Sequence, residues 1–157
     1  MATLLALTKG QPVRELIAGQ SLITAGEQSG ELYVLESGRL AVMRDGVSIA
    51  TITEPGALIG EMSVLLGIEH SATVRAEADS VVRTIENPIA FLERQPLVAL
   101  HVATLACARL NSTSALLVEL RKESAGHDKQ QGLLSRIFAS MVASEPKRNQ
   151  ADWDTHE

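Results

Sequence analysis

The chain has 157 residues, 45% of them apolar, and a formal net charge of −5. This length fits one domain with a short extension, and the acidic balance argues against a general nucleic-acid binder, which needs clustered Lys and Arg. The single cysteine, Cys107, excludes an internal disulfide and is expected to be a small buried core residue in a reducing, cytoplasmic protein. The apolar start MATLLALTKG is too short for a signal peptide, and PLVALHVATLACARL is too short to span a bilayer, so no membrane segment is expected.

Residues 13–86 consist of short runs that alternate apolar and polar residues, as half-buried strands do. The runs read VRELI, SLITAG, ELYVLE, RLAVMR, VSIATI, SATVRAE and SVVRTIE. Ser37-Gly38 and Pro55-Gly56 separate some of them, and Asp45-Gly46 between the fourth and fifth is a strong signal for a two-residue hairpin turn. Many short strands with Gly-rich turns predict a sandwich or a small barrel with an aliphatic core, because aromatic residues are scarce.

The periodicity becomes helical after Asn87. A short helix is expected over IAFLERQ with Pro88 in its first turn, followed by a long helix over residues 97–122 that Gly126 would end. A third helix is expected over residues 129–144, followed by a polar tail.

The long helix carries a seam whose spacings alternate between four and three residues and in which only Thr113 is polar. Its positions are Ala99, Ala103, Ala106, Leu110, Thr113, Leu117 and Leu120. A neighbouring face, made of Val98, Val102, Leu105 and Leu116, could pack on the barrel instead. Two apolar faces favour a homodimer through this helix, and the alternative is a helix that packs only on its own barrel.

The stretch IGEMSVLLGIEHSATVRA, residues 59–76, has the composition of an anion-binding loop. Gly60 would let the backbone approach a ligand closely, and Met62 and Ser63 would offer unpaired backbone N–H groups at the start of a short helix. Glu61 is an acceptor beside these donors, and Ser71 adds a hydroxyl from the other side of the loop. Such a loop suits a ligand that has both a phosphate and hydroxyl groups.

Residues 13–120 resemble a cyclic nucleotide-binding domain of the catabolite activator protein and protein kinase A regulatory-subunit type. The resemblance lies in the glycine-punctuated strands and in GEMSVLLGIEHSATVRA, which is similar to the phosphate-binding cassette of that family. It implies a mainly β fold with α-helices, an antiparallel jelly-roll barrel followed by C-terminal helices. The expected domain covers residues 1–126, with a C-terminal helix and tail over 127–157 and no DNA-binding helix-turn-helix.

The resemblance also implies roles for individual residues. Gly60 and Glu61 would serve the ribose, with Glu61 accepting from its 2′-hydroxyl. The amides of Met62 and Ser63 would hold the cyclic phosphate with help from Ser71, and Thr113 and Ser114 on the long helix would contact the purine. The departure is His70, which stands where the family has its phosphate-binding arginine.

His70 can give the phosphate at most one hydrogen bond, whereas arginine gives two and a permanent charge. Losing one charge-assisted hydrogen bond costs about 1.5–3 kcal/mol, or roughly tenfold to a hundredfold in affinity. We therefore expect weak binding, another ligand or none.

Each role has a simpler alternative. Glu61 could only stabilise the helix start, His70 could be a surface loop residue, and Ser71 could only bond its local backbone. Thr113 and Ser114 could set the register of the seam or face solvent.

The sequence favours a regulatory module that senses cAMP or cGMP and signals through its C-terminal helices. The alternative is a nucleotide-independent dimeric interaction protein that kept the fold, with an unidentified protein partner. A metal-dependent enzyme is not expected, because residues 1–69 contain no His. No catalytic residue, metal site or cofactor is predicted, apart from the cyclic nucleotide as ligand. Direct DNA binding is not expected, because residues 125–157 hold few basic residues.

Overall fold

The structure is a computed structural model that describes residues 3–124, 132–133, 135–137 and 139. All of the predicted strands and the first two predicted helices lie within these residues. The predicted third helix over 129–144 and the polar tail lie mostly outside them.

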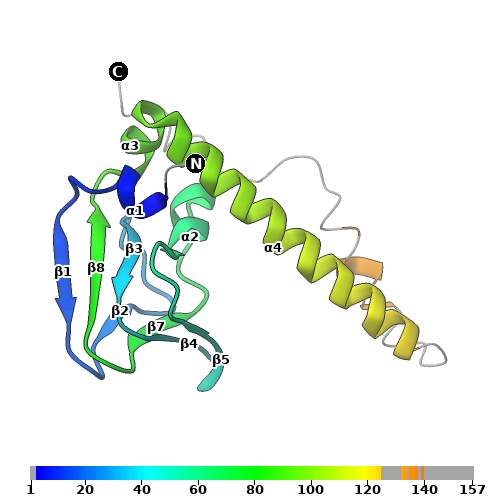
Figure 1. Ribbon diagram of the computed structural model, residues 1–157. Coiled ribbons are helices and arrows are strands. Elements are labelled where there is room, and N and C mark those ends of the chain that lie inside the picture. The colour runs from blue at the N-terminus through cyan, green and yellow to red at the C-terminus, as the bar shows by residue number, and fades with distance from the viewer. Residues whose placement is uncertain (1–2, 125–131, 134, 138, 140–157) are drawn as a thin grey trace. The chain divides into compact units, whose positions relative to one another are not determined.

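Eight strands in the described residues form two four-stranded sheets in which every pairing is antiparallel. The first sheet has the order β1 (Val13–Leu16), β8 (Ser80–Ile85), β3 (Leu32–Ser37) and β6 (Leu58–Ile59). The second has the order β2 (Ser21–Ile23), β7 (Thr73–Ala76), β4 (Leu40–Arg44) and β5 (Val47–Ile52). Consecutive strands often lie in different sheets, as Figure 1 shows, so the predicted antiparallel β-roll is confirmed.

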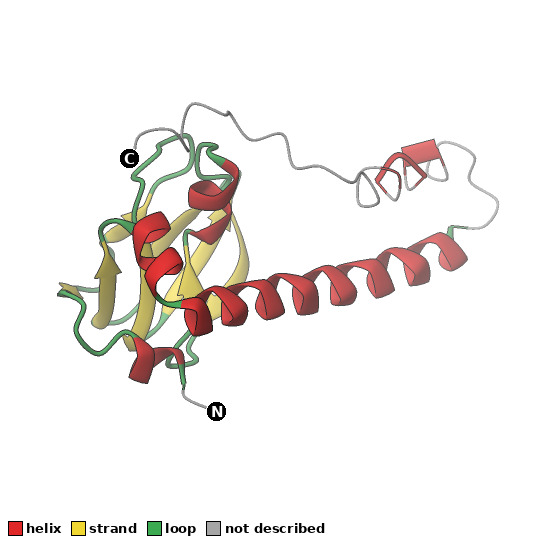
Figure 2. Ribbon diagram, turned by 90° about the horizontal axis from the view of Figure 1, so that it is seen from above, coloured by secondary structure: helices red, strands yellow, loops and turns green. Residues whose placement is uncertain are grey.

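The two sheets share one core, because inward side chains of both belong to a single buried cluster. Its members are Leu16, Leu22, Ile23, Tyr33, Leu35, Leu40, Ile59, Val74, Ala76 and Val82. The core is aliphatic, as predicted, with Tyr33 as its largest member. Burying each of the larger aliphatic side chains stabilises the fold by about 1.5–3 kcal/mol. Figure 2 shows the strands curling around this interior, with short helices beside them.

Two turns set the paths of the strands. Asp45 and Gly46 both have positive φ, 51° and 77°, as the predicted two-residue hairpin between β4 and β5 requires. Gly38 has φ 107°, and a Cβ placed on it would lie 2.2 Å from the Ser80 hydroxyl oxygen. Only glycine fits there, and the chain passes at this point from the first sheet to the second instead of forming a hairpin.

A four-residue helix that the sequence did not predict, α1 (Leu4–Leu7), packs on the first sheet. Thr3 caps it, and Leu4 is buried. Arg83 of β8 holds it in place, because its guanidinium donates both to the Leu5 carbonyl and to the Glu36 carboxylate. The other helices are α2 (Glu61–Leu66), α3 (Pro88–Arg94) and α4 (Pro96–Glu123).

The chain divides into two compact units after His101, within α4. In the first unit, Val98 of α4 is fully buried. In the second unit, Leu110 and Leu120 of the predicted seam are 48% and 49% exposed. Cys107 is exposed, so its expected place in a core was wrong; it lies on an outer face of the helix. The predicted domain boundary at residue 126 stays a prediction. In the described part of the chain, no helix combines the length and apolarity needed to cross a membrane.

Candidate functional site

The candidate site is the segment between β6 and β7, residues 60–72, which connects the two sheets. β6 ends at Ile59, which pairs with Tyr33 in the first sheet. β7 begins at Thr73, which pairs with Met43 in the second sheet. The segment is therefore fixed at both ends by separate sheets, and α2 forms its first half.

Gly60 is the N-cap residue of α2 and adopts a left-handed conformation with φ 90°. A Cβ at this position would lie 3.1 Å from the Glu31 carbonyl oxygen, so the backbone passes too close to the residue before β3 for a side chain to fit easily. Glycine also has no side chain with which to cap the helix. The N–H groups of the first turn of α2 therefore receive no acceptor from the N-cap residue and are suited to an acceptor from outside the chain.

The next three residues differ in exposure. Glu61 is half-buried in the first turn of α2, and Met62 is 57% exposed. Ser63 is 3% exposed, and its hydroxyl donates to the Ile68 carbonyl at 2.5 Å. Since this hydroxyl closes the far end of α2, only the backbone N–H of Ser63 is left for the predicted phosphate contact.

His70 is buried, with 6% of its surface exposed, so the alternative that it is a surface loop residue is wrong. Its Nε2 lies 3.0 Å from the Ser29 hydroxyl oxygen. Its backbone N–H donates to Glu27, and its carbonyl accepts from Gly26, both at 2.9 Å. A Cβ built on Gly60 would lie 3.9 Å from the imidazole Cε1. The side chain that replaces the arginine is thus directly beside the cassette glycine, but it bonds to another loop of the protein.

Burial lowers the pKa of His70, and the nearby Glu27 carboxylate offsets only part of that effect. His70 is therefore neutral at pH 7 and shares a single hydrogen with Ser29. It carries no charge for a phosphate in this state.

Tyr33 and Glu31 form a polar pair next to Ser29, the partner of His70, that the sequence did not predict. The Tyr33 hydroxyl donates to Glu31 Oε2 at 2.5 Å. Burial, with the Glu31 bond as a second cause, raises the pKa of Tyr33 to about 12. The sequence feature that could have indicated this pair is the chain's only tyrosine, which stands two residues after Glu31 and four after Ser29.

The other three predicted site residues are not part of α2. Ser71 is exposed directly after His70. Thr113 and Ser114 belong to the second unit, where their hydroxyls donate to the Arg109 and Leu110 carbonyls of the same helix at 2.9 and 2.8 Å. These bonds satisfy both hydroxyls without a ligand, and their contact with a purine stays a prediction.

The sequence profile described as "Cyclic nucleotide-binding domain" matches residues 13–90, which include both sheets, α2 and His70. Residues 13–90 belong to the cyclic nucleotide-binding domain family. The chain containing this domain is 31% identical over 113 residues to the "Cyclic AMP receptor protein" of Thermus thermophilus, covering 68% of this chain and 52% of that protein. It is 29% identical over 69 residues to the "cAMP-dependent protein kinase regulatory subunit" of Yarrowia lipolytica, covering 44% of this chain and 18% of that protein.

A solved structure supports the same family. The crystal structure of the catabolite activator protein of Thermus thermophilus superposes with a TM-score of 0.67 at 30% identity, covering 76% of this chain and 59% of that one. The chain thus spans about half the length of the Thermus receptor protein and less than a fifth of the Yarrowia subunit. The predicted family and fold are confirmed by these similarities.

Proposed function

We propose that this chain is a regulatory module that binds cAMP or cGMP weakly between the cassette and the β-roll and has no catalytic step of its own. Support for a cyclic nucleotide comes from the domain family and from the two relatives whose names refer to cyclic AMP. Support for the place comes from α2, which starts at a glycine that leaves its first-turn amides uncapped by a side chain.

The ligand contacts follow from the chemistry of this loop. The backbone N–H groups of Met62 and Ser63 donate to the cyclic phosphate, and the positive end of α2 adds a favourable dipole. Glu61 accepts from the ribose 2′-hydroxyl, and Ser71 donates to the phosphate from the other end of the loop. Because α2 is only six residues long, its dipole is small, and affinity depends strongly on the side chain at position 70.

Weak binding rests on one observation, the bond between His70 and Ser29. A neutral imidazole already bonded to a serine must exchange that partner for the phosphate. The exchange gains less than a guanidinium would, because no charge is brought to the phosphate unless His70 also takes up a proton.

The output in this proposal passes through α4, which also forms a homodimer along residues 97–122. The exposed Leu110 and Leu120 of the heptad seam support this interface, because large apolar side chains at such positions are usually covered by a partner. Signalling requires that the ligand bind one arrangement of the helices better than another. The module would act in the cytoplasm on a protein partner rather than on DNA.

A second candidate is a nucleotide-independent dimeric interaction protein. It is favoured by the same observation, since the His70 side chain is used inside the protein. The glycine start of α2 favours the sensor, because an interaction protein has no need for a helix start without a side-chain cap there.

The test is calorimetric titration of the purified protein with cAMP, cGMP and cyclic dinucleotides, with 5′-AMP as the acyclic control. We expect weak binding of cAMP or cGMP, and affinity that rises by about tenfold to a hundredfold in His70→Arg, because the new guanidinium adds a charge-assisted hydrogen bond. Absence of binding in both proteins would favour the interaction protein. Equal affinity in both would refute the role given to His70.

A further inference from the structure

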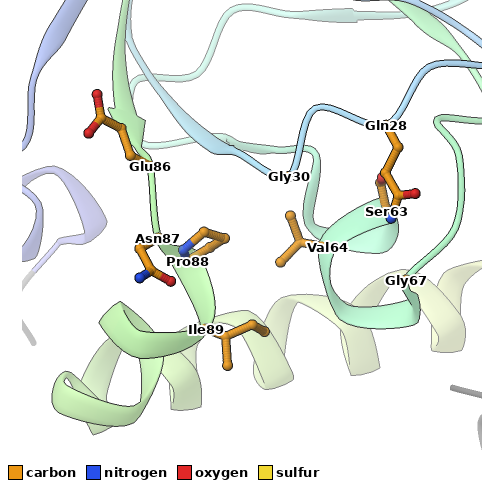
Figure 3. Close-up of a pocket in the computed structure, with 9 residues that line it drawn as sticks. All are labelled: Gln28, Gly30, Ser63, Val64, Gly67, Glu86, Asn87, Pro88 and Ile89. Atoms are coloured by element: carbon orange, nitrogen blue, oxygen red, sulfur yellow. The ribbon is translucent and has the colours of Figure 1, made fainter. Parts of the chain in front are cut away.

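A cavity of about 200 Å³ lies between α2, the loop at residues 28–30 and the start of α3. Its lining residues are Gln28, Gly30, Ser63, Val64, Gly67, Glu86, Asn87, Pro88 and Ile89. Figure 3 shows Val64 of α2 and Pro88 at the start of α3 pointing toward one another across it. A single water needs roughly 10–15 Å³, whereas drug-sized ligands occupy about 300–1,000 Å³. The cavity therefore has the size for a ligand smaller than a drug.

The lining determines what kind of molecule fits. None of the nine described residues that line the cavity is Lys, Arg or His, so a phosphate or another anion would find no countercharge. Glu86 is exposed, and Figure 3 shows its carboxylate directed away from Val64 and Pro88, so it does not call for a cation between them. Gln28 and Asn87 carry carboxamides, each of which offers a donor and an acceptor side by side. Val64, Pro88 and Ile89 supply apolar walls. Adjacent donor and acceptor groups on a flat, neutral ring match such amides, as in the pairing of Asn or Gln with adenine.

The cavity is linked to the cassette in two ways, through Ser63 of α2 and through the loop at residues 28–30. Ser63 lines the cavity, and its backbone N–H is a proposed phosphate donor on α2. Gln28 and Gly30 also line it, and Ser29 between them bonds His70 at 3.0 Å. A molecule that moves the 28–30 loop must therefore move the partner of His70.

We propose that this cavity is a second ligand site, for a small neutral heterocycle with adjacent hydrogen-bond donor and acceptor groups, such as a nucleobase or a ring carboxamide. Its occupancy acts on His70 through Ser29. By thermodynamic linkage, a ligand that changes the environment of His70 also changes the affinity for whatever His70 contacts, by the same factor in both directions. The binding itself does not depend on the cyclic nucleotide proposal.

The experiment is a two-dimensional amide NMR titration of the full chain with adenine and with nicotinamide, without any cyclic nucleotide. The ligand is added up to about 10 mM, because a molecule with so few atoms can bind only weakly. We expect saturable shifts at the amides of Gly30, Val64, Gly67 and Ile89. Inorganic phosphate, whose proposed contacts are the amides of Met62 and Ser63, should leave the amides of Gly30 and Ile89 unchanged. Scattered or non-saturating shifts, or shifts of Gly30 and Ile89 caused by phosphate, would overturn the proposal.

Variants then locate the site. Val64→Phe should fill the cavity and abolish the saturable shifts. Asn87→Ala keeps an exposed position and should weaken binding by about threefold to tenfold, the effect of one hydrogen bond. Asn111→Ala, an exposed asparagine on α4, is the matched control and should bind as the natural chain does. If the Asn87→Ala variant and the Val64→Phe variant both bind with unchanged affinity, the site is refuted.

The coupling has its own readout, the imidazole Cε1–H signal of His70. Adenine or nicotinamide should shift this signal in the natural chain. In Ser29→Ala the cavity amides should still shift, and the His70 signal should not follow them. A His70 shift that persists in Ser29→Ala would contradict the coupling. Failure of cyclic nucleotides to bind would leave all of these results unaffected.

Discussion

Ser29→Ala is predicted to lower the stability of the protein and to tighten its binding of cAMP. The Ser29 hydroxyl and His70 Nε2 are 3.0 Å apart, and the imidazole is 6% exposed. Removing the hydroxyl leaves a buried nitrogen without this partner, which costs about 1–3 kcal/mol of unfolding free energy. In our proposal the phosphate takes the imidazole from Ser29. The variant no longer has to break that bond, whose net value is about 0.5–1.5 kcal/mol, so the Kd should fall about twofold to tenfold.

The two effects are measured separately, by urea unfolding and by calorimetric titration with cAMP. Ser48→Ala on β5 removes an exposed hydroxyl and is the control, with stability changed by less than about 0.5 kcal/mol. Weaker binding of cAMP by Ser29→Ala would show that Ser29 orients His70 for the ligand, and would refute the exchange of partners. Unchanged binding with reduced stability would show that His70 does not contact the ligand at all.

Three further predictions concern the cassette, the titration of His70 and the seam. Gly60→Ala should lose about 1–2 kcal/mol of stability, because φ is 90° there and the new Cβ would crowd the Glu31 carbonyl. Gly10→Ala, where a Cβ meets nothing within 4 Å, should change stability by less than about 0.5 kcal/mol, and equal losses in the two would contradict the account. The pKa of His70 is lowered in the folded state, whereas in the unfolded chain it has its ordinary value of about 6.5. The imidazole therefore takes up a proton more readily in the unfolded chain as pH falls below that value. The natural chain should therefore lose stability relative to His70→Gln as pH falls below about 6.5. Urea unfolding at several pH values measures this, and an equal pH dependence of the unfolding free energy in the two proteins would refute it. Leu110→Asp and Leu117→Asp should each give monomers in sedimentation at concentrations where the natural chain is a dimer, and persistent dimers would exclude the seam.

The strands and the long helix could be predicted because their signals are local. β5 spans Val47–Ile52, the predicted run VSIATI, since Asp45-Gly46 fixes where the hairpin turns. α4 spans Pro96–Glu123 against the predicted 97–122. The four-residue α1 was not predicted, because too few residues exist for a periodic pattern and its position depends on Arg83, 78 residues away from Leu5.

The site could be predicted only where it is continuous in sequence. Gly60 to Ser63 form the start of a short helix, as the cassette pattern indicated. The burial of His70 and its bond to Ser29 could not be read from the sequence, since the two residues are 41 positions apart and meet only when the loop at 26–29 pairs with His70. A sequence shows which side chain replaces the arginine, but the surrounding strands decide where that side chain points.

In the proposed function, the first-turn amides of α2 and the neighbouring His70 receive a cyclic phosphate. The most direct measurement is the amide NMR spectrum of the full chain as cAMP is added to saturation. We expect the largest downfield shifts at the N–H groups of Met62 and Ser63, with the His70 imidazole signals moving in the same titration. Saturable binding that leaves Met62, Ser63 and His70 unshifted would contradict it.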